Sequence, residues 1–316
     1  MNAAQSELYS IGSAYVSKNN ASVAVQPDQQ LSSGKDAKSV IIFSIARGTS
    51  TLLYRVFSNL VGEGKEFPEG SALLEPFTQA YHIEHQLEGT PGFNRQEAWP
   101  VNTECAKKLV LERVKNGFTV IKELAYQLDE NKVDDAFLTE LFEYAEPLFL
   151  VRSPESTIPS GMYPYFEKGD VTRYSKEEAG FFELHQLFDR VSKIISRQPL
   201  IIEAEEYLEN PTDQLSQYFS ALGLTFKQEY LSFTPYGEQD KQNDPSFMVW
   251  GDTWYKNAFA TKELKARKVQ KCMASDYQVL LHNPVACEHL EDRLVKSRSS
   301  YKKLLQDGVK PGQLNK

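Results

Sequence analysis

The sequence predicts an α/β fold, in which helices cover both faces of a central parallel sheet. Two observations lead to this prediction: short apolar runs recur along the chain, and segments with helical periodicity separate them. An apolar run without polar alternation is typical of a strand buried on both faces, as in a parallel sheet. The clearest runs lie at residues 40–43, 118–121, 148–151 and 200–202.

The first strand leads into a loop of small polar residues, and a helix follows. The loop reads Arg47-Gly48-Thr49-Ser50-Thr51, and apolar residues then recur on one helical stripe up to Leu60. Free amides and the dipole at a helix start favour a bound anion, and a glycine lets the backbone approach it. The Arg47 guanidinium fits phosphate or sulfate oxygens. The segment has no G-x-x-x-x-G-K-S/T pattern, which argues against ordinary ATP or GTP hydrolysis.

A short strand at Leu73-Leu74 is expected to deliver Glu75 to its carboxyl end, because Pro76 disfavours helix at Glu75. His82 and His85 follow in a polar segment, and residues 89–102 have the Gly, Pro and Asn content of a loop. Residues 103–115 then predict a helix.

The next strand is expected to end at Lys122-Glu123, and Asp134 is positioned to cap the helix after it. The third strand ends at Arg152, and a loop beginning Ser153-Pro154 is expected to lead towards Ser160. The pattern S-x-x-E at Ser175–Glu178 predicts a capping box before a long helix.

The fourth strand precedes Asn210 and Pro211, which suit the first positions of a further helix. Residues 234–254 are predicted to be loop-rich, and the chain from Thr261 onward to be helical and charged. The aromatic side chains at this loop would either wall a ligand pocket or pack on the domain. These side chains are Trp250, Trp254 and Tyr255.

The predicted organisation is a loosely ordered arm at residues 1–36 and one domain at 37–316, of which 232–316 is loop-rich and helical. The net charge of −8 argues against binding to nucleic acid or to an anionic membrane. No apolar run reaches the roughly 18 residues that span a bilayer, and no secretory signal is expected.

The three cysteines, Cys105, Cys272 and Cys287, have no zinc-site or C-x-x-C spacing. They predict free thiols in a reducing cytoplasm. No metal-ligand cluster is expected from the sequence. The oligomeric state stays open, a homodimer included.

The candidate functional residues share one position in the predicted sheet. Each follows or ends a strand, and ligands of such sheets bind outside the carboxyl ends of the strands. They are Arg47, Glu75, Lys122, Glu123 and Arg152.

Three segments resemble, in order, those of sulfotransferases that use 3′-phosphoadenosine 5′-phosphosulfate (PAPS). Residues 47–51 are similar to the loop that holds the 5′-phosphosulfate. Residues 150–154, with Ser160 eight positions after Arg152, are similar to the strand end and serine that bind the 3′-phosphate. Residues 201–224 resemble the strand, D-P turn and L-G-L helix end of the family. The resemblance covers about residues 38–233 and implies a P-loop-like sulfotransferase fold with a helical C-terminal part, near a microbial small-molecule branch and suited to secondary metabolism.

The resemblance implies a role for each matching residue. Arg47 would bind the 5′-phosphate and the bridging oxygen, together with the loop residues Gly48, Thr49, Ser50 and Thr51. Arg152 and Ser160 would hold the 3′-phosphate, and Lys122 would steady the sulfuryl group. PAPS would be the co-substrate, PAP the product, and no metal would be needed.

The sequence departs most from the family at the position of the base that takes the acceptor's proton. The Lys-Thr-His of small-molecule sulfotransferases is Lys122-Glu123-Leu124 here, so their catalytic histidine has no counterpart. A hydroxyl acceptor needs a base within hydrogen-bond reach. Glu75 is the leading candidate, and Glu123, His82 and His85 are the alternatives.

The leading functional hypothesis is therefore transfer of a sulfuryl group to a hydroxyl or amine of a small molecule. Gly48 and Thr49 stand where the family usually has Ser and Gly. This altered loop and the missing histidine favour one alternative, a nucleotide-binding regulatory protein without turnover. An ATP-dependent phosphotransferase is the other, and it lacks support from a Walker lysine.

Overall fold

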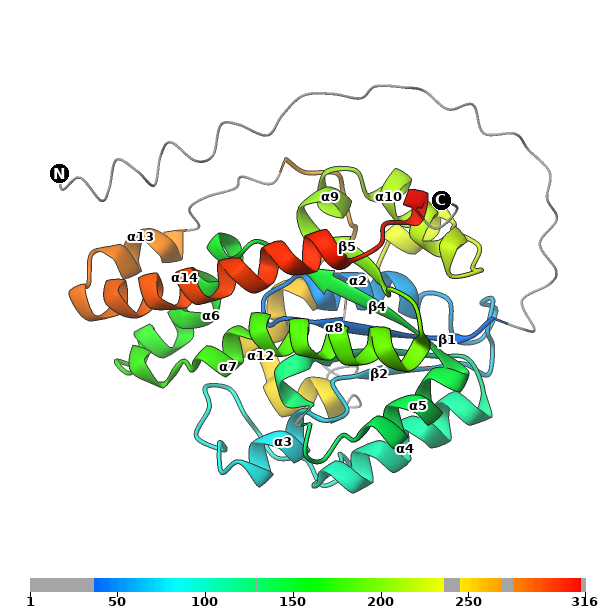
Figure 1. The fold of residues 1–316 in the computed structure, drawn as a ribbon, viewed down its shortest axis with the longest axis horizontal. Helices are drawn as coiled ribbons and strands as arrows, with labels where there is room; N and C mark the ends of the chain where they lie inside the picture. The colour runs from blue at the N-terminus through cyan, green and yellow to red at the C-terminus, as the bar shows by residue number, and fades with distance from the viewer. Residues whose placement is uncertain (1–36, 129, 236–244, 269–274, 314–316) are drawn as a thin grey trace. The chain divides into compact units, whose positions relative to one another are not determined.

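The structure is a computed structural model that describes residues 37–128, 130–235, 245–268 and 275–313. The predicted arm at 1–36 lies outside the described residues. Figure 1 shows the ribbon coloured along the chain. Across the described residues, no helix combines the length and apolar character that crossing a bilayer requires.

A five-stranded, all-parallel sheet forms the centre of the fold, which confirms the predicted α/β class. The strands are β1 (Ser39–Ser44), β2 (Ser71–Leu74), β3 (Thr119–Leu124), β4 (Ala145–Val151) and β5 (Leu200–Glu203). Their order across the sheet is β2-β3-β1-β4-β5. Since β1 lies in the middle, the loop that follows it has strand ends on both sides.

Helices occupy most of the remaining described chain. They are α2 (Ser50–Ser58), α3 (Thr78–Glu84), α4 (Thr103–Asn116), α5 (Asp135–Tyr144), α6 (Pro154–Glu167), α7 (Lys176–Ala179), α8 (Phe181–Ile195), α9 (Ala204–Glu209), α10 (Pro211–Ala221), α12 (Pro245–Ala260), α13 (Ser275–Leu281) and α14 (Pro284–Asp307). The expected helix at 103–115 is confirmed as α4, and Asp134 caps α5 by accepting a hydrogen bond from the Phe137 amide at 2.8 Å.

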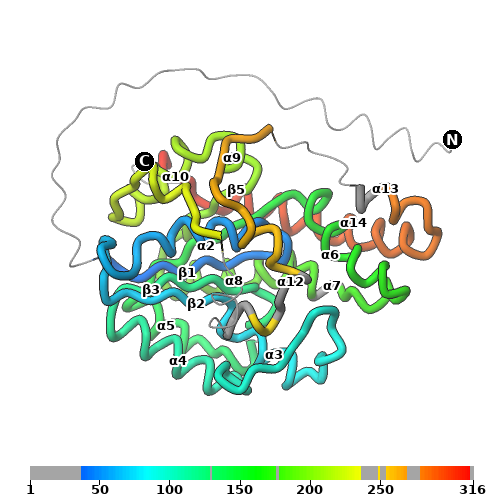
Figure 2. The backbone as a smooth tube through the Cα atoms, turned by 180° about the vertical axis from the view of Figure 1, so that it is seen from behind, coloured from blue at the N-terminus to red at the C-terminus, as the bar shows by residue number. Residues whose placement is uncertain are grey.

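The apolar strands are buried because helices cover both faces of the sheet. Phe43 of β1 and Phe149 of β4 are register partners, with ring centroids 5.3 Å apart. Phe188 of α8 packs edge-on against Phe149, so α8 covers this face (Figure 1). Figure 2, from behind, shows α2 and α12 on the opposite side. Full burial of one such ring contributes about 1.5–3 kcal/mol.

The expected loop after Arg152 is wrong, because α6 begins at Pro154 and carries Ser160 within a helix. Pro159 and Pro164 lie inside α6, and prolines normally argue against helix. Packing explains the difference: Ile158 and Met162 are buried in the core, so tertiary contacts outweigh the local preference.

The loop-rich prediction for 234–254 is also wrong from Pro245 onward, where α12 begins. A buried guanidinium anchors the far end of this helix to α2. Arg55 donates to the carbonyls of Ala258 at 2.5 Å, Thr261 at 2.9 Å and Thr234 at 2.8 Å. Arg55 and Ala258 are 203 positions apart, so no local sequence pattern could predict this contact.

The capping box at Ser175 and Glu178 is confirmed, but it caps the four-residue α7. Gly180, with φ 75°, separates α7 from the long α8. A positive φ suits glycine, which explains the break in the expected single helix.

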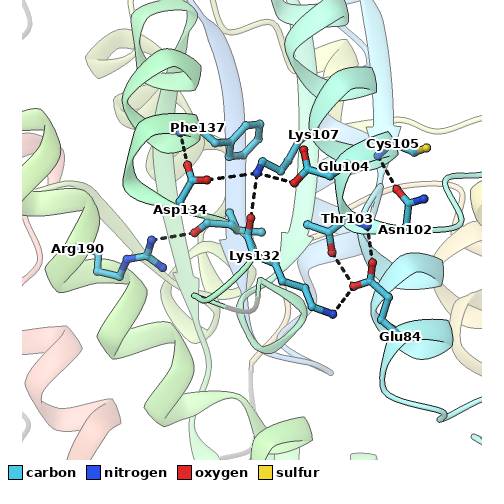
Figure 3. A network of polar contacts seen from close by, with 11 residues as sticks. Glu84, Asn102, Thr103, Glu104, Cys105, Lys107, Lys132, Asp134, Phe137 and Arg190 are labelled. Atoms are coloured by element: carbon cyan, nitrogen blue, oxygen red, sulfur yellow. Dashed lines mark hydrogen bonds and ion pairs between the residues drawn. The ribbon is translucent and has the colours of Figure 1, made fainter.

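A network of polar contacts joins α3, α4 and the segment before α5 (Figure 3). We call it the surface network and define it by Glu84, Thr103, Lys107, Lys132 and Asp134. The Glu84 carboxylate accepts from the Thr103 amide and hydroxyl, both at 2.8 Å, and from Lys132 at 2.7 Å. Lys107 donates to Glu104 at 2.8 Å and to the Lys132 carbonyl at 2.9 Å. The network fixes the chain that leads from β2 to β3.

Candidate anion-binding site

The carboxyl ends of the strands open onto a cavity of about 320 Å³, which we call the anion cavity. Parallel strands bring these ends to one edge of the sheet, as the sequence predicted. Candidate residues at the carboxyl ends of β1, β2, β3 and β4 line it, together with residues of α6 and α12. Those predicted from the sequence are Arg47, Thr49, Ser50, Thr51, Glu75, Lys122, Arg152, Ser160, Trp254 and Tyr255.

The loop between β1 and α2 has an uncommon backbone conformation. Arg47 has φ 60° and Thr49 has φ 67°, both in the left-handed region that non-glycine residues seldom adopt. The Gly48 amide donates to the Ile45 carbonyl at 3.4 Å, and a Cβ on Gly48 would lie 3.1 Å from that oxygen. Tyr207 supports the turn, because its hydroxyl donates to the Thr49 carbonyl at 3.1 Å. The fold therefore holds a strained loop in place.

The start of α2 presents hydrogen-bond donors to the anion cavity. Among the described residues, the amides of Thr49, Ser50 and Thr51 and the hydroxyls of Ser50 and Thr51 have no protein partner. Thr49 is the residue before the helix, and its side chain does not cap it. These donors are therefore available to an anion at the positive end of the helix dipole.

Arg47 is held against the far wall of the anion cavity. Its Nε donates to the Ser160 hydroxyl at 2.9 Å, and its Nη1 donates to the Trp254 carbonyl at 3.2 Å. The guanidinium carbon lies 5.5 Å from the centroid of the Trp254 ring. The loop after β1, helix α6 and helix α12 therefore meet at this one side chain.

Arg152 extends from the end of β4 into the same cavity. One Nη1 donates to the Arg47 carbonyl at 3.2 Å, whereas its buried Nε has no hydrogen-bond partner in the described part of the chain. Burial lowers the pKa of Arg152, and the nearby Glu205 carboxylate opposes this shift. A buried donor without a partner is uncommon in folded proteins, which makes this Nε a candidate contact for a bound anion. Arg152 does not pair with Glu155, which instead binds Arg298 at 2.8 Å.

Glu75 and Lys122 form a buried ion pair at the cavity wall. Their side chains are 3% and 2% exposed. Glu75 follows β2 as predicted, with φ 53°, and its amide donates to the Lys122 carbonyl at 2.7 Å. Burial and the neighbouring Glu75 carboxylate raise the pKa of Tyr255 well above its ordinary value. Glu75, Lys122 and Tyr255 thus meet in the same cavity as Arg47, Arg152 and the donors at the start of α2.

Glu123 lies outside the cavity lining, because adjacent strand residues point to opposite faces of the sheet. Lys122 and Leu124 line the cavity, and Glu123 between them is fully buried. Its oxygens accept from the amides of Phe77 at 2.9 Å and Leu124 at 2.8 Å. Burial, and then the nearby Glu75, raise the pKa of Glu123 to about 8. Glu123 therefore binds backbone amides on the side of the sheet away from the cavity.

The two histidines also lie outside the cavity lining, and their assignment to a polar segment is wrong for His82. His82 is on α3, fully buried, with its ring stacked on Phe93 at 5.1 Å. Its Nδ1 contacts the Thr78 carbonyl at 2.9 Å, and burial lowers its pKa to about 4. His85 is stacked on Tyr81 at 4.2 Å. Gly48 shapes the loop but does not line the cavity.

Several lining residues escaped the sequence analysis. One of them is Arg267, which lies after α12 and adds a further positively charged side chain to the cavity wall. Four others form a cluster of phenols around one carboxylate: Tyr126, Tyr165, Tyr174 and Glu178. In the sequence, Glu178 has only the pattern of a capping residue, and single tyrosines have no local pattern that distinguishes a cavity wall from a core. Among the described residues, no group of three or more His, Cys, Asp or Glu is arranged to hold a metal.

Comparison with known proteins gives distant likenesses. No protein-family model and no curated protein matches the sequence. The structure is similar to the sulfotransferase domain from the curacin biosynthetic pathway, with 15% identity and a TM-score of 0.38 over 78% of this chain and 97% of that domain. It is also similar to the sulfotransferase domain from the Synechococcus PCC 7002 olefin synthase, with 16% identity and a TM-score of 0.38 over 79% and 97%. At these values the assignment below depends on the chain's own residues.

Proposed function

We propose that this chain transfers a sulfuryl group from PAPS to a hydroxyl or amine of a small-molecule acceptor in the cytoplasm. One observation carries the proposal most directly: two separate sets of anion-binding groups face one cavity. One set is the start of α2 with Arg47, and the other is Arg152 with its unpartnered buried Nε. PAPS has two anionic groups, at its 5′ and 3′ positions, so a site for it needs two such sets.

The residues fit the donor's phosphates. Arg47, with the donors of Ser50 and Thr51, would bind the 5′-phosphosulfate, because amides at a helix start and a guanidinium both favour such oxygens. Arg152 and Ser160 would bind the 3′-phosphate. Arg47 contacts Ser160 at 2.9 Å, so the two proposed phosphate sites would be adjacent.

The transfer step needs a base and stabilisation of the leaving charge. The acceptor oxygen would attack sulfur, the bond from sulfur to the bridging oxygen would break, and PAP would leave with that electron pair. Glu75 would take the acceptor proton. Lys122, which is paired with Glu75, would steady the charge of the sulfuryl oxygens. Arg47 would stabilise the bridging oxygen as it becomes a phosphate oxygen.

The proposal is tested by incubating the protein with PAPS and a panel of alcohols, phenols and amines, and by measuring PAP release and sulfated product together. We expect PAP to form in equal amount with a sulfated acceptor, and Arg152→Ala to reduce the rate at low PAPS. PAP binding without product from any acceptor would favour the nucleotide-binding regulatory protein. Product formed only with ATP and Mg²⁺ would favour a phosphotransferase and overturn the proposal.

A further inference from the structure

Helix α9 contacts three of the segments that line the anion cavity. The Tyr207 hydroxyl donates to the Thr49 carbonyl, in the loop after β1, at 3.1 Å. Glu205 binds the turn between β4 and α6, and the Leu208 carbonyl accepts from the Arg267 amide at 2.9 Å. All six residues of α9 are described, and none of them lines the cavity. The helix can therefore act on a ligand through the segments that it holds.

Glu205 holds the turn from β4 into α6. Its Oε1 accepts from the Ser153 amide at 3.1 Å and from the Ser153 hydroxyl at 2.7 Å. The register of β4 with β5 ends at Val151 and Glu203, so these two bonds fix the chain just beyond the sheet. Glu205 is 5% exposed, and burial shields the bonds from competing water.

The start of α6 is held by Glu205 rather than by a cap of its own. Ser153 is the residue before the helix, but its side chain makes no capping bond. Asp134 and Asn283, in contrast, cap α5 and α14 through their own side-chain oxygens. Ser153 instead donates its hydroxyl to Glu205. The position of the first turn of α6 therefore depends on a side chain from α9.

The turn held by Glu205 joins Arg152 and Ser160, which we call the 3′ set. Arg152 directly precedes Ser153, and Ser160 lies further along α6. Burial lowers the pKa of Arg152, and among the charged groups around it Glu205 opposes this shift most. In the described part of the chain, Arg152 Nε and Glu205 Oε2 are nevertheless buried without hydrogen-bond partners. Glu205 thus favours the charged form of Arg152 and leaves its Nε donor unused.

We propose that Glu205 is a positioning residue for the 3′ set: through Ser153 it orients Arg152 and places the helix of Ser160, without contacting the nucleotide. The inference rests on the proposed function for the identity of the ligand. Tyr207 holds the loop of the other set, the start of α2 with Arg47, which we call the 5′ set. One short helix thus positions both sets, each through a different side chain.

The test compares PAP with adenosine 5′-monophosphate (AMP), because these nucleotides differ only in the 3′-phosphate. Each is titrated by calorimetry into the unaltered protein and into its variants. Glu205→Ala removes both bonds to Ser153 and should weaken PAP about tenfold, the loss of one charge-assisted contact, while AMP affinity changes less than about twofold. Glu205→Gln keeps an oxygen that can accept both bonds, so it should recover most of the PAP affinity that Glu205→Ala loses.

Two further variants of α9 separate positioning from a general loss of structure. Tyr207→Phe releases the loop of the 5′ set, which both nucleotides would use, so PAP and AMP should weaken by similar factors. Glu206→Ala is the matched control, since Glu206 is the next glutamate along α9 and pairs with Lys310. An ion pair this exposed contributes little, so both affinities should stay within about twofold.

The outcomes distinguish the inference from the proposed function. Equal losses of PAP and AMP in Glu205→Ala, an unchanged PAP affinity, or no recovery in Glu205→Gln would overturn the inference even where the unaltered protein binds PAP. Failure of the unaltered protein to bind PAP would overturn the proposed function. The link is then measured in the nucleotide-free protein from the Arg152 Nε–H nuclear magnetic resonance signal, which is assigned by its loss in Arg152→Ala. A signal displaced in Glu205→Ala but not in Glu206→Ala supports the positioning role, and any other pattern refutes it.

Discussion

The anion cavity and the surface network use the same kinds of charged residue in opposite ways. In the surface network, Glu84 has three hydrogen bonds from Thr103 and Lys132, and Lys107 reaches three oxygens (Figure 3). Its donors and acceptors are satisfied by one another at the protein surface. At the anion cavity, Arg152 keeps a buried donor without a protein partner, and three amides at the start of α2 are equally unsatisfied among the described residues.

The backbone is also relaxed in the surface network and strained at the anion cavity. Asp134 of the surface network caps α5, and Asn102, beside Thr103, caps α4; both residues have ordinary extended conformations. Arg47, Thr49 and Glu75 at the cavity all have positive φ. Each such residue costs of order 1–3 kcal/mol and persists only where the surrounding fold holds it. Both regions are charged, so charge alone does not distinguish the candidate site; unsatisfied donors and a strained backbone do.

The largest expected effect is on turnover. Glu75→Gln should reduce the rate about 10²–10⁴-fold, because glutamine keeps the size of the side chain but cannot accept the acceptor proton. PAP affinity, which we propose depends on Arg47 and Arg152, should change little. Turnover and PAP binding are measured on one preparation. A near-normal rate would remove Glu75 from the role of base, and lost PAP affinity would make it structural.

The second effect is on stability. Lys122→Met should lower the free energy of unfolding by about 3–5 kcal/mol, because it leaves the Glu75 charge buried without its partner. Urea unfolding measures the change. The double variant Glu75→Gln, Lys122→Met should recover much of the loss. A double variant that is less stable than Lys122→Met would show that the pair is not the source of the effect.

The third effect is on nucleotide selectivity. Arg152→Ala should weaken PAP about tenfold or more, since a charge-assisted hydrogen bond contributes about 1.5–3 kcal/mol. Adenosine 5′-phosphosulfate, which lacks the 3′-phosphate, should bind nearly as before. Arg190→Ala in contact with Asp135 near the surface network is the control and should leave both affinities unchanged. Equal losses for the two nucleotides would place Arg152 elsewhere on the donor.

The smallest effect is expected in the surface network. Burial acts to raise the pKa of Glu84, but hydrogen bonds from Lys132 and Thr103 outweigh it and lower that pKa. A lowered folded-state pKa stabilises the protein above the unfolded carboxyl pKa, and the contribution disappears as the pH falls through the folded value. Glu84→Gln should therefore cost about 1 kcal/mol or less at pH 7, and less at acidic pH. A cost that grows on acidification would contradict this sign.

The sequence predicted the edge of the sheet where the cavity lies, because apolar strand runs are distinct and the ends of parallel strands must meet. Arg47, Glu75, Lys122 and Arg152 were found in this way. The sequence did not separate Lys122 from Glu123, although strand alternation requires that only one of them face the cavity. Which face that is depends on how helices are layered on the sheet.

The remaining differences come from long-range contacts. Helix α12 brings Trp254 and Tyr255 to the cavity, and Arg55 bonds the carbonyl of Ala258 near the end of that helix and those of Thr261 and Thr234 outside it, all remote in sequence. The burial of His82 depends on stacking with Phe93 rather than on a pattern in α3. Tyr126, Tyr165, Tyr174 and Glu178 come from separate segments to line the cavity, and in the sequence these tyrosines resemble core residues. Such positions follow from packing, which local periodicity does not encode.

The most direct test of the central claim, that the anion cavity binds PAP, is thermal unfolding with and without the nucleotide. PAP at a hundred times its Kd should add about 2.7 kcal/mol to the free energy of unfolding and raise Tm. The shift should shrink at the same PAP concentration in Arg152→Ala and persist in Glu84→Gln. No shift at millimolar PAP, with a clear shift from ATP and Mg²⁺, would contradict the account.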